Sequence, residues 1–331
     1  MTAPCPSHLA ARADDRAAPR VIVLCGPTAA GKTAVGIALA RELGGEIVGA
    51  DAMQVYRRMD IGTAKPTPAE RALVPHHLID IVEPDEPFDA ARYALLARQA
   101  VADIRHRGKI PLVVGGTGLY IKALLYGLFP GPAGDPAVRL RLAAELAAQG
   151  VEALHARLAH GDPETARRLH PRDTARILRA LEVLETTGRP ISSFQQAHRF
   201  ADSPYAALIL GLGIERPLLY ARIDRRVEDM LAAGLEDEVR GLLAAGFSPR
   251  LKPLQSLGYR HMAAWLEGRL SREEAVRTMK RDTRRYAKRQ MTWFRATAGI
   301  RWFAPEAFPA IAAACRAFLE PAPRTGPPLA R

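Results

Sequence analysis

The chain is 331 residues long, and its 47 Lys and Arg against 35 Asp and Glu give a formal net charge of +12. This length allows a large apolar core, and the three Cys are scattered without a C-x-x-C pair, which argues against a disulfide framework or a zinc site. The charge favours a polyanionic partner, nucleic acid first, although an arginine-rich composition without functional meaning is an open alternative. No segment reaches the roughly 20 apolar residues of a membrane span, so we expect a cytoplasmic protein with no membrane partner.

The first predicted elements form a phosphate-binding unit. Residues 1–19 lack the apolar stretch of a signal peptide and are predicted to be a disordered leader. The apolar run VIVLC at 21–25 predicts a strand, and the residues after it, GPTAAGKT, match the phosphate-loop pattern G-x-x-x-x-G-K-S/T. In such a loop, backbone N–H groups and a helix start attract phosphate, Lys32 adds a positive charge and Thr33 can hold magnesium. The predicted phosphate-binding residues are Gly26, Pro27, Thr28, Ala29, Ala30, Gly31, Lys32 and Thr33.

Strands and helices then alternate along the chain. EIVGA at 46–50, HHLIDIV at 76–82 and IPLVVGG at 110–116 predict strands, and apolar spacing predicts helices between and after them. This alternation predicts an α/β fold of the P-loop NTPase type, in which helices cover both faces of a parallel sheet. Ligands of such sheets lie at the carboxyl ends of the strands, so the phosphate loop, Asp51 and Thr117 are expected along one rim.

The middle of the chain has a different pattern, with helical segments and no evident strands. YAALILGLG at 205–213 predicts that the sheet resumes afterwards, and further helices are expected near 217–245 and 259–295, followed by a short strand at RWF. The predicted domains are a leader at 1–19, a core at 20–133 and 204–305, an inserted helical subdomain at 134–203 and a disordered tail at 320–331.

Three further segments carry side chains that suit a ligand. Asp51 follows the second strand and can act as a magnesium-bound carboxylate, as a general base, or only as a turn cap. Thr117 follows two glycines at the start of a helix and suits either a helix cap or a ligand contact. In LQSLGYRHM, Gly258 begins a plain helix, or Tyr259 and Arg260 face a base or a phosphate.

The segment TMKRDTRRYAKRQMTWFR at 278–295 is strongly basic. On a helix its cations cover a broad face, and the run itself contains few acidic residues to neutralise them. A solvated charged face is the usual explanation of such a run. Because compensating glutamates are lacking, we favour contact with phosphates, and the aromatic residues nearby favour nucleic acid.

Taken together, these segments resemble the tRNA dimethylallyltransferase family over about residues 20–305. GPTAAGKT, DAMQVYRRMDIGTAKP, PLVVGGTGLYIKALLYG, HPRDTARILRALEV, QSLGYR and KRQMTWFR occur in the family's order. This family transfers a dimethylallyl group from dimethylallyl diphosphate to N6 of the adenosine 3′ of the anticodon in tRNA and releases diphosphate. Two departures are minor: Ala30 replaces a frequent serine, and ARILR at 175–179 is less polar than in other members. The layout resembles that of bacterial members.

The resemblance implies roles for the matching residues. Asp51 would be the base that accepts the N6 proton, and Thr117 and Arg139 would be catalytic residues that bind the diphosphate or line the reaction channel. Lys32 would neutralise the diphosphate, and Thr33 would hold Mg²⁺, the implied cofactor. The implied partners are tRNA and dimethylallyl diphosphate, and we expect a monomer. The implied tRNA-binding residues are Asp51, Ala52, Met53, Gln54, Ala175, Arg176, Ile177, Leu178, Arg179, Gln255, Ser256, Leu257, Gly258, Tyr259, Arg260, Lys288, Arg289, Gln290, Met291, Thr292, Trp293, Phe294 and Arg295.

Three other functions share part of this pattern. A small-molecule kinase has the same loop and sheet but needs no basic, aromatic segment near the C-terminus. An adenylate isopentenyltransferase prenylates free nucleotides, and a mononucleotide needs neither the basic segment nor the inserted helices. A non-catalytic RNA-binding protein would not depend on Asp51 for any chemistry. The sequence therefore favours prenylation of tRNA.

Overall fold

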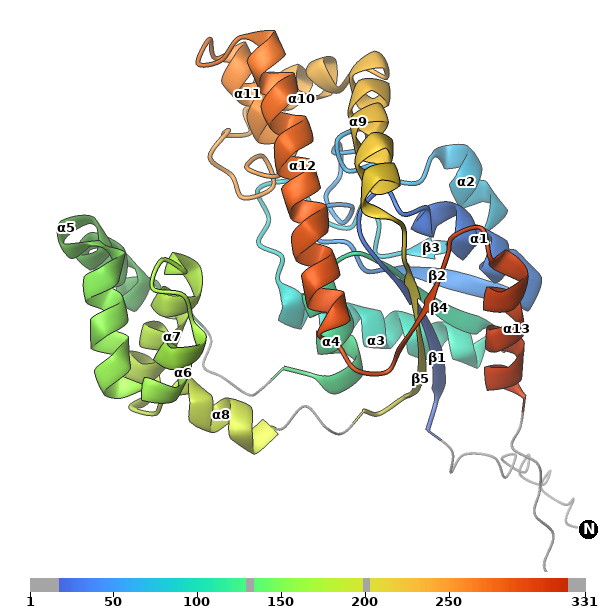
Figure 1. Cartoon of the computed structure of the whole chain (residues 1–331), viewed down its shortest axis with the longest axis horizontal. Coiled ribbons are helices and arrows are strands. Elements are labelled where there is room, and N and C mark those ends of the chain that lie inside the picture. Colours follow the sequence, from blue (N-terminus) through green and yellow to red (C-terminus); the bar gives the residue numbers. More distant parts are fainter. Residues whose placement is uncertain (1–17, 129–133, 199–202, 321–331) are drawn as a thin grey trace, which may run out of the picture. The chain divides into compact units, whose positions relative to one another are not determined.

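The structure, a computed structural model, describes residues 18–128, 134–198 and 203–320, and within them six parallel strands form one sheet (Figure 1). The strand order is β3-β2-β4-β1-β5-β6. The strands are β1 Arg20–Cys25, β2 Gly45–Gly49, β3 His76–His77, β4 Ile110–Gly115, β5 Ala206–Leu212 and β6 Ile300–Phe303. The predicted α/β fold with a parallel sheet is confirmed. β1, which leads into the phosphate loop, lies inside the sheet between β4 and β5.

Helices follow the strands in the chain, and the sheet with its helices forms one compact unit, Met1–Leu125 with Pro204–Arg331, which we call the core unit. No helix in the described ranges is both long and apolar enough to span a bilayer. The helices of the core unit are α1 Lys32–Leu43, α2 Pro68–Leu73, α3 Ala90–His106, α4 Gly118–Tyr126, α9 Arg216–Ala232, α10 Leu235–Ala244, α11 Tyr259–Leu266, α12 Arg272–Arg295 and α13 Phe308–Leu319.

The sheet is buried on both faces. From Val21 to Cys25 every residue of β1 is fully buried, as expected for an apolar run without alternation in a parallel sheet. Ile22 and Leu24 pack with α1 and α13 in one apolar cluster. α3 packs against β2 and β4, and Figure 1 shows α3 and α4 on the other side of the sheet from α1 and α13. These layers hold the carboxyl ends of β1, β2 and β4 side by side.

The C-terminal helices bring distant parts of the sequence to the same end of the sheet. α12 packs against both α9 and α11, and α10 packs against α9 and α11; Figure 1 shows α9 and α12 alongside each other. α12 starts at Ser271, whose side chain accepts a hydrogen bond from the backbone N–H of Glu274, and acidic residues occupy its first turn. This long helix carries the basic segment 278–295.

Residues Tyr126–Ser203 form a second compact unit, which we call the helical unit. Its apolar core contains Leu154, Leu158 and Leu181. α5 is interrupted at Gly150, where φ is 82° and ψ is 170°, so it consists of two helical stretches on either side of this glycine. The helices of this unit are α5 Pro136–Gly161, α6 Pro163–Arg168, α7 Thr174–Thr187 and α8 Ile191–His198.

Two details of the predicted organisation differ in the structure. The helical unit begins at Tyr126 rather than at residue 134, and the predicted leader and tail fall almost wholly outside the described residues. The third strand is also much shorter than the predicted 76–82. It ends at His77 because Leu78 and Asp80 adopt positive φ values of 63° and 56°, which turn the chain out of the sheet.

Four of the described helices were not predicted, namely the short helices α2, α6 and α8 and the longer α13. α2 has a capping box, in which the Thr67 hydroxyl accepts from the backbone N–H of Glu70 while the Glu70 carboxylate accepts from the backbone N–H of Thr67. Thr67, the proline after it and this glutamate are local signals of a helix start, although no helix is predicted there.

Candidate active site

A cavity of about 320 Å³ lies at the carboxyl ends of β1, β2 and β4. All the residues that line it belong to the core unit, and α9 and α12 contribute several of them. The loops after the three strands therefore meet at one site, as expected at the carboxyl edge of a parallel sheet. Polar residues that line the cavity include Thr28, Lys32, Thr33, Asp51, Gln54, Thr117, Arg226, Ser256 and Gln290.

The phosphate loop has the backbone that its glycines allow. Gly26 has a φ of 145°, and a Cβ there would come within 2.9 Å of the Leu212 carbonyl oxygen. Gly31 precedes α1 with a φ of 87°, a conformation that side-chain-bearing residues rarely adopt. The loop thus leads directly into the start of α1, where unpaired N–H groups and the helix dipole favour an anion.

Lys32 lies in the loop, and its Nζ donates to the carbonyl oxygens of Gly26 at 3.0 Å and Pro27 at 2.6 Å. The pKa of Lys32 is lowered to about 8, mainly by burial and also by the positive charge of Arg226, while the charge of Asp51 opposes this shift. The free energy of charging this lysine is therefore reduced when an anion enters the cavity.

Arg226 on α9 is a cavity residue that the sequence analysis missed. It donates to the Thr28 hydroxyl at 3.3 Å, and burial lowers its pKa. The buried positions Leu219, Ile223 and Val227 mark the inner face of α9. Because Arg226 is three residues after Ile223, the spacing alone could have placed it near that face.

Gln290 on α12 is predicted to bind tRNA, and the structure places it inside the protein, 8% exposed. Its Oε1 accepts from the backbone N–H of Thr28 at 2.9 Å, and its Nε2 donates to the Gly116 carbonyl at 2.8 Å. A Cβ on Gly116 would lie 2.5 Å from that Nε2, so this glycine permits the close approach. Gln290 thus connects the phosphate loop to the loop after β4.

Asp51 is held by its own backbone turn. Its Oδ1 accepts from the backbone N–H groups of Met53 at 2.8 Å and Gln54 at 3.3 Å, whereas Oδ2 accepts no hydrogen bond from the described residues. One carboxylate oxygen is therefore fixed and the other is available to a ligand.

Thr117 joins the loop of Asp51 to the loop after β4. Its hydroxyl accepts from the backbone N–H of Ala52 at 3.0 Å, and its own N–H donates to the Ala50 carbonyl at 3.0 Å. The interpretation of its side chain as a helix cap is therefore wrong, because the hydroxyl binds a neighbouring loop rather than the first turn of α4. The hydroxyl proton remains free for a cavity ligand.

The segment 255–260 is divided between the cavity and the interior. Ser256 and Leu257 line the cavity, and the buried Ser256 Oγ has no hydrogen-bond partner in the described residues. Tyr259 is fully buried, and its hydroxyl donates to Glu238 at 2.6 Å. The expectation that this tyrosine faces a base is therefore wrong, whereas Ser256 and Leu257 can contact a ligand in the cavity.

Acidic residues elsewhere in the fold neutralise more of the positive charge of the basic segment than the sequence of the segment indicates. Arg284 pairs with Asp224 at 2.5 Å and Lys280 with Glu228 at 2.7 Å. Both acids belong to α9, so the sequence of the basic segment alone could not reveal these ion pairs. Asp282, which accepts from Arg281 and Arg260, has its pKa held far below the usual range by these hydrogen bonds.

Three cations of the predicted tRNA-binding set remain exposed and lack an acidic partner within 4 Å among the described residues: Lys288, Arg289 and Arg295. Phe294 is buried at 1% exposure, and the ring of Trp293 packs over Gly118, where a Cβ would lie 2.3 Å away. Trp293 and Phe294 therefore anchor α12, whereas Tyr286 lines the cavity and the exposed cations form the open surface of the helix.

The remaining predicted site residues belong to the helical unit. Arg139 donates through Nε to Glu182 at 2.6 Å, and Arg179 donates to the other oxygen of that buried glutamate at 2.7 Å. Arg176 is exposed, whereas Ile177 lies in the apolar core of the unit. A role of these residues toward diphosphate or tRNA stays a prediction.

Oxygen donors suitable for magnesium are present in the cavity as the Thr33 hydroxyl and the Asp51 carboxylate. Across the described ranges, no group of three His, Cys, Asp or Glu side chains could hold a metal ion by itself. This donor set fits Mg²⁺, which is commonly bound through one or two protein oxygens together with substrate phosphates and water.

Comparisons with known proteins agree with this arrangement. The family model for IPP transferase matches residues 54–297, and that for isopentenyl transferase matches 19–78. A tRNA dimethylallyltransferase from Desulfosudis oleivorans is 58% identical over 302 residues, which cover 91% of this chain and 93% of that protein. One from Syntrophobacter fumaroxidans is 58% identical over 86% of this chain and 83% of its own length.

Solved structures are similar as well. The full-length tRNA isopentenylpyrophosphate transferase of Bacillus halodurans is 40% identical, with a TM-score of 0.68 over 90% of this chain and 96% of that one. A eukaryotic dimethylallyltransferase acting on tRNA is 30% identical, with a TM-score of 0.75 over 90% of this chain and 77% of that one. By sequence identity and coverage, the chain belongs to the tRNA dimethylallyltransferase family.

Proposed function

We propose that this protein transfers the dimethylallyl group of dimethylallyl diphosphate to N6 of the adenosine 3′ of the anticodon in tRNA, with release of diphosphate. The observation that supports this most is a single cavity that joins Lys32 and Arg226 to the carboxylate of Asp51. Val227 and Met230 line the same cavity and suit a hydrocarbon. We also propose that the protein is a monomer and that it acts in the cytoplasm, where tRNA is modified.

The diphosphate is the leaving group, and the phosphate loop stabilises its departure. Loop N–H groups, Lys32 and Arg226 stabilise the negative charge that grows on the departing oxygen as the bond to the allylic carbon breaks. Such preorganised charges are often the largest catalytic contribution. Mg²⁺, bound by Thr33, would supply further positive charge beside the diphosphate.

The acceptor is an exocyclic amino group, which is a weak nucleophile because its lone pair is delocalised into the adenine ring. The allylic carbon must therefore carry most of the activation. Asp51 accepts the N6 proton through its unpartnered carboxylate oxygen as the C–N bond forms. Thr117 supports it by holding the neighbouring loop.

The adenosine must leave its stack to reach a cavity of this kind, at a cost of a few kcal/mol that contacts with the RNA backbone have to offset. Lys288, Arg289 and Arg295 are the exposed cations proposed to make these contacts. From the family resemblance alone, we also propose that Arg139 binds the diphosphate and that residues 175–179 contact tRNA.

The direct test is incubation with labelled dimethylallyl diphosphate and, in separate reactions, tRNA or AMP. We expect label in tRNA, at the adenosine 3′ of the anticodon, and little on AMP. Label mainly on AMP would favour the adenylate isopentenyltransferase alternative. A parallel reaction with labelled ATP tests for a kinase, and phosphorylation of a small molecule without prenyl transfer would contradict the proposal.

Binding of dimethylallyl diphosphate is expected to weaken as the pH rises above about 8, the pKa of Lys32. An anion beside Lys32 raises its pKa, so binding takes up a proton wherever the free lysine is neutral. Linkage then predicts a loss of affinity of at most about tenfold per pH unit above that point. Calorimetry from pH 7.5 to 9.5 in buffers of different ionisation enthalpy measures both the affinity and the proton uptake.

Lys32→Arg serves as the control in this experiment because arginine keeps its charge over the whole range. We expect its affinity, whatever its absolute value, to be nearly independent of pH. An equal pH dependence in both proteins would assign the effect to another group.

Binding of tRNA is expected to depend less on salt when Lys288 and Arg289 are both replaced by glutamine. Each cation that contacts a phosphate contributes about 0.7 to 0.9 to the slope of log K against log salt, so the slope should fall by about 1.4 to 1.8. Arg272→Gln with Arg277→Gln removes two cations that already pair with glutamates, and this control should leave the slope unchanged. Equal slopes for the two double variants would show that Lys288 and Arg289 do not contact RNA phosphates.

A further inference from the structure

A carboxylate on α10 holds a loop that borders the cavity. Glu238 Oε2 accepts from the backbone N–H groups of Asp60 at 2.8 Å and Ile61 at 2.7 Å, and its Oε1 accepts from that of Gly62 at 3.1 Å. Three successive N–H groups directed at one carboxylate form an anion-binding concavity of the kind that backbone turns make. Here the bound anion belongs to the protein itself.

The same carboxylate is fixed from the other side by α11. The Tyr259 hydroxyl donates to Glu238 Oε1 at 2.6 Å. The tyrosine ring packs against Gly62, where an added Cβ would lie 2.5 Å from Cε2. The loop, α10 and α11 are therefore joined by four hydrogen bonds to a single side chain, and a residue larger than glycine at position 62 would separate them.

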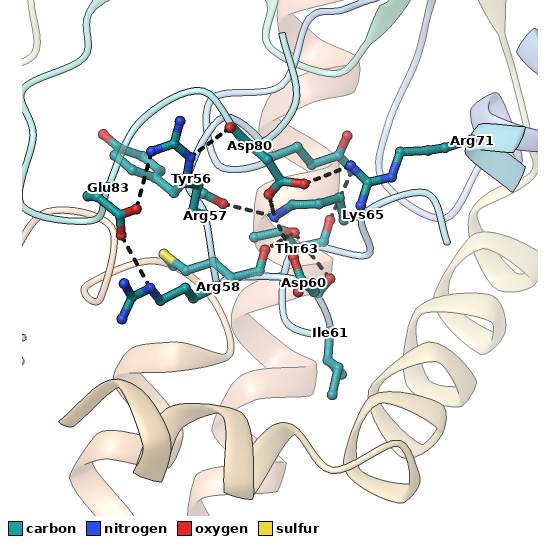
Figure 2. Close-up of polar contacts among 12 residues, drawn as sticks. Tyr56, Arg57, Arg58, Asp60, Ile61, Thr63, Lys65, Arg71, Asp80 and Glu83 are labelled. Atoms are coloured by element: carbon teal, nitrogen blue, oxygen red, sulfur yellow. Dashed lines mark hydrogen bonds and ion pairs between the residues drawn. The ribbon is translucent and has the colours of Figure 1, made fainter. Parts of the chain in front are cut away.

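A second set of contacts holds the next part of the loop (Figure 2). The buried Lys65 donates through Nζ to the Tyr56 carbonyl at 2.8 Å and pairs with Asp60 and Asp80 at 2.5 Å each. Arg71 pairs with the other oxygen of Asp80 at 2.7 Å. Residues 56–65 are thus fastened at the Lys65 end by ion pairs and at residues 60–62 by Glu238.

The loop at residues 56–65 in turn positions the side chain of Gln54, which lines the cavity. Gln54 Nε2 donates to the carbonyl oxygens of Thr63 and Ala64, at 3.1 Å in each case. The backbone N–H of Gln54 donates to Asp51 Oδ1. Gln54, Thr63 and Ala64 all line the cavity. A continuous path of hydrogen bonds and backbone therefore leads from Glu238 to the carboxylate of Asp51.

We propose that Glu238 is a positioning residue for the acceptor side of the reaction: through the N–H groups of residues 60–62 it fixes the loop that sets Gln54 and Asp51. This inference rests on the proposed function, because it assigns Asp51 to the acceptor. The phosphate loop, Lys32 and Arg226 make no hydrogen bond to Glu238 or to this loop in the described structure. Loss of Glu238 should therefore affect the transfer step and leave binding of the diphosphate largely intact.

Glu238→Gln is the sharpest test, since it keeps the size of the side chain and replaces one accepting oxygen by an NH₂ group that faces N–H donors. We expect hydrogen exchange in 58–66 to accelerate by about tenfold or more. The turnover rate with tRNA should fall by about 10- to 100-fold, because small misplacements of reacting groups lower reaction rates by such factors. The affinity for dimethylallyl diphosphate should stay within about twofold, because its binding groups are untouched.

Glu236→Gln is the matched control, because this glutamate lies on the same helix and pairs with Arg272 at the surface. It should change neither exchange in 58–66 nor turnover. If Glu238→Gln does not fold, Tyr259→Phe removes a single hydrogen bond from the same carboxylate and should slow turnover by about two- to fivefold.

Faster exchange in 58–66 with unchanged turnover would overturn the positioning role. A parallel loss of turnover and diphosphate affinity would overturn it too, because it would indicate general damage to the fold. Failure of the proposed function looks different: the wild-type protein itself would then transfer no dimethylallyl group to tRNA, while Glu238→Gln would still loosen the loop.

Discussion

Replacement of Asp51 by asparagine is expected to lower the rate of dimethylallyl transfer by about 10²- to 10⁴-fold, the usual contribution of a positioned general base. Asparagine keeps an oxygen that can accept from the backbone N–H groups of Met53 and Gln54, so the turn should survive. What it loses is the basic oxygen Oδ2, which accepts no hydrogen bond from the described residues. Single-turnover reactions with saturating dimethylallyl diphosphate and tRNA measure the transfer step directly.

Measurements of ligand affinity distinguish the loss of a general base from damage to the cavity. The affinities of Asp51→Asn for tRNA and for dimethylallyl diphosphate should stay within about threefold of wild type, since neither ligand depends on the basic oxygen for most of its binding energy. Asp103→Asn, at an exposed position of α3, is the control and should be fully active. A transfer rate within tenfold of wild type would show that another group accepts the proton.

Replacement of Arg226 by methionine is expected to reduce the affinity for dimethylallyl diphosphate by about 1.5–3 kcal/mol, or roughly 10- to 150-fold. The guanidinium is partly buried beside the phosphate loop and donates to the Thr28 hydroxyl. A charge in such a site is worth more than one in water, because fewer water molecules screen it. Methionine preserves much of the volume and flexibility of the side chain, so the loss should come mainly from charge and hydrogen bonds.

Arg225→Met is the matched control for this substitution. Arg225 is the adjacent residue on α9, its side chain is 78% exposed, and it pairs with Asp229 at the surface. Surface pairs contribute little, so its loss should change diphosphate affinity by less than about twofold. Equal effects of the two substitutions would indicate long-range attraction by the basic surface rather than contact at the loop.

Sequence patterns were sufficient for the phosphate loop and for most of the sheet, although the local capping box of α2 was overlooked. GPTAAGKT predicts the strand, the turn and the helix start, because glycines with positive φ and a helix N-terminus need only neighbouring residues. The alternation of apolar runs and helical segments likewise predicts the parallel sheet. It failed at 78–82, where an apolar run leaves the sheet at two residues with positive φ while Lys65 and Arg71 hold Asp80 by ion pairs.

For the candidate active site too, some features follow from the sequence and others only from the tertiary structure. The sequence by itself determined that a phosphate loop, Asp51 and Thr117 share one rim, since the carboxyl ends of parallel strands must meet there. Only the tertiary structure decided that Arg226 enters the cavity, that Gln290 and Tyr259 are interior, and that acids of α9 neutralise part of the basic segment. The physical reason is that these contacts join helices far apart in the chain, and their pairing depends on how the helices pack rather than on any local pattern.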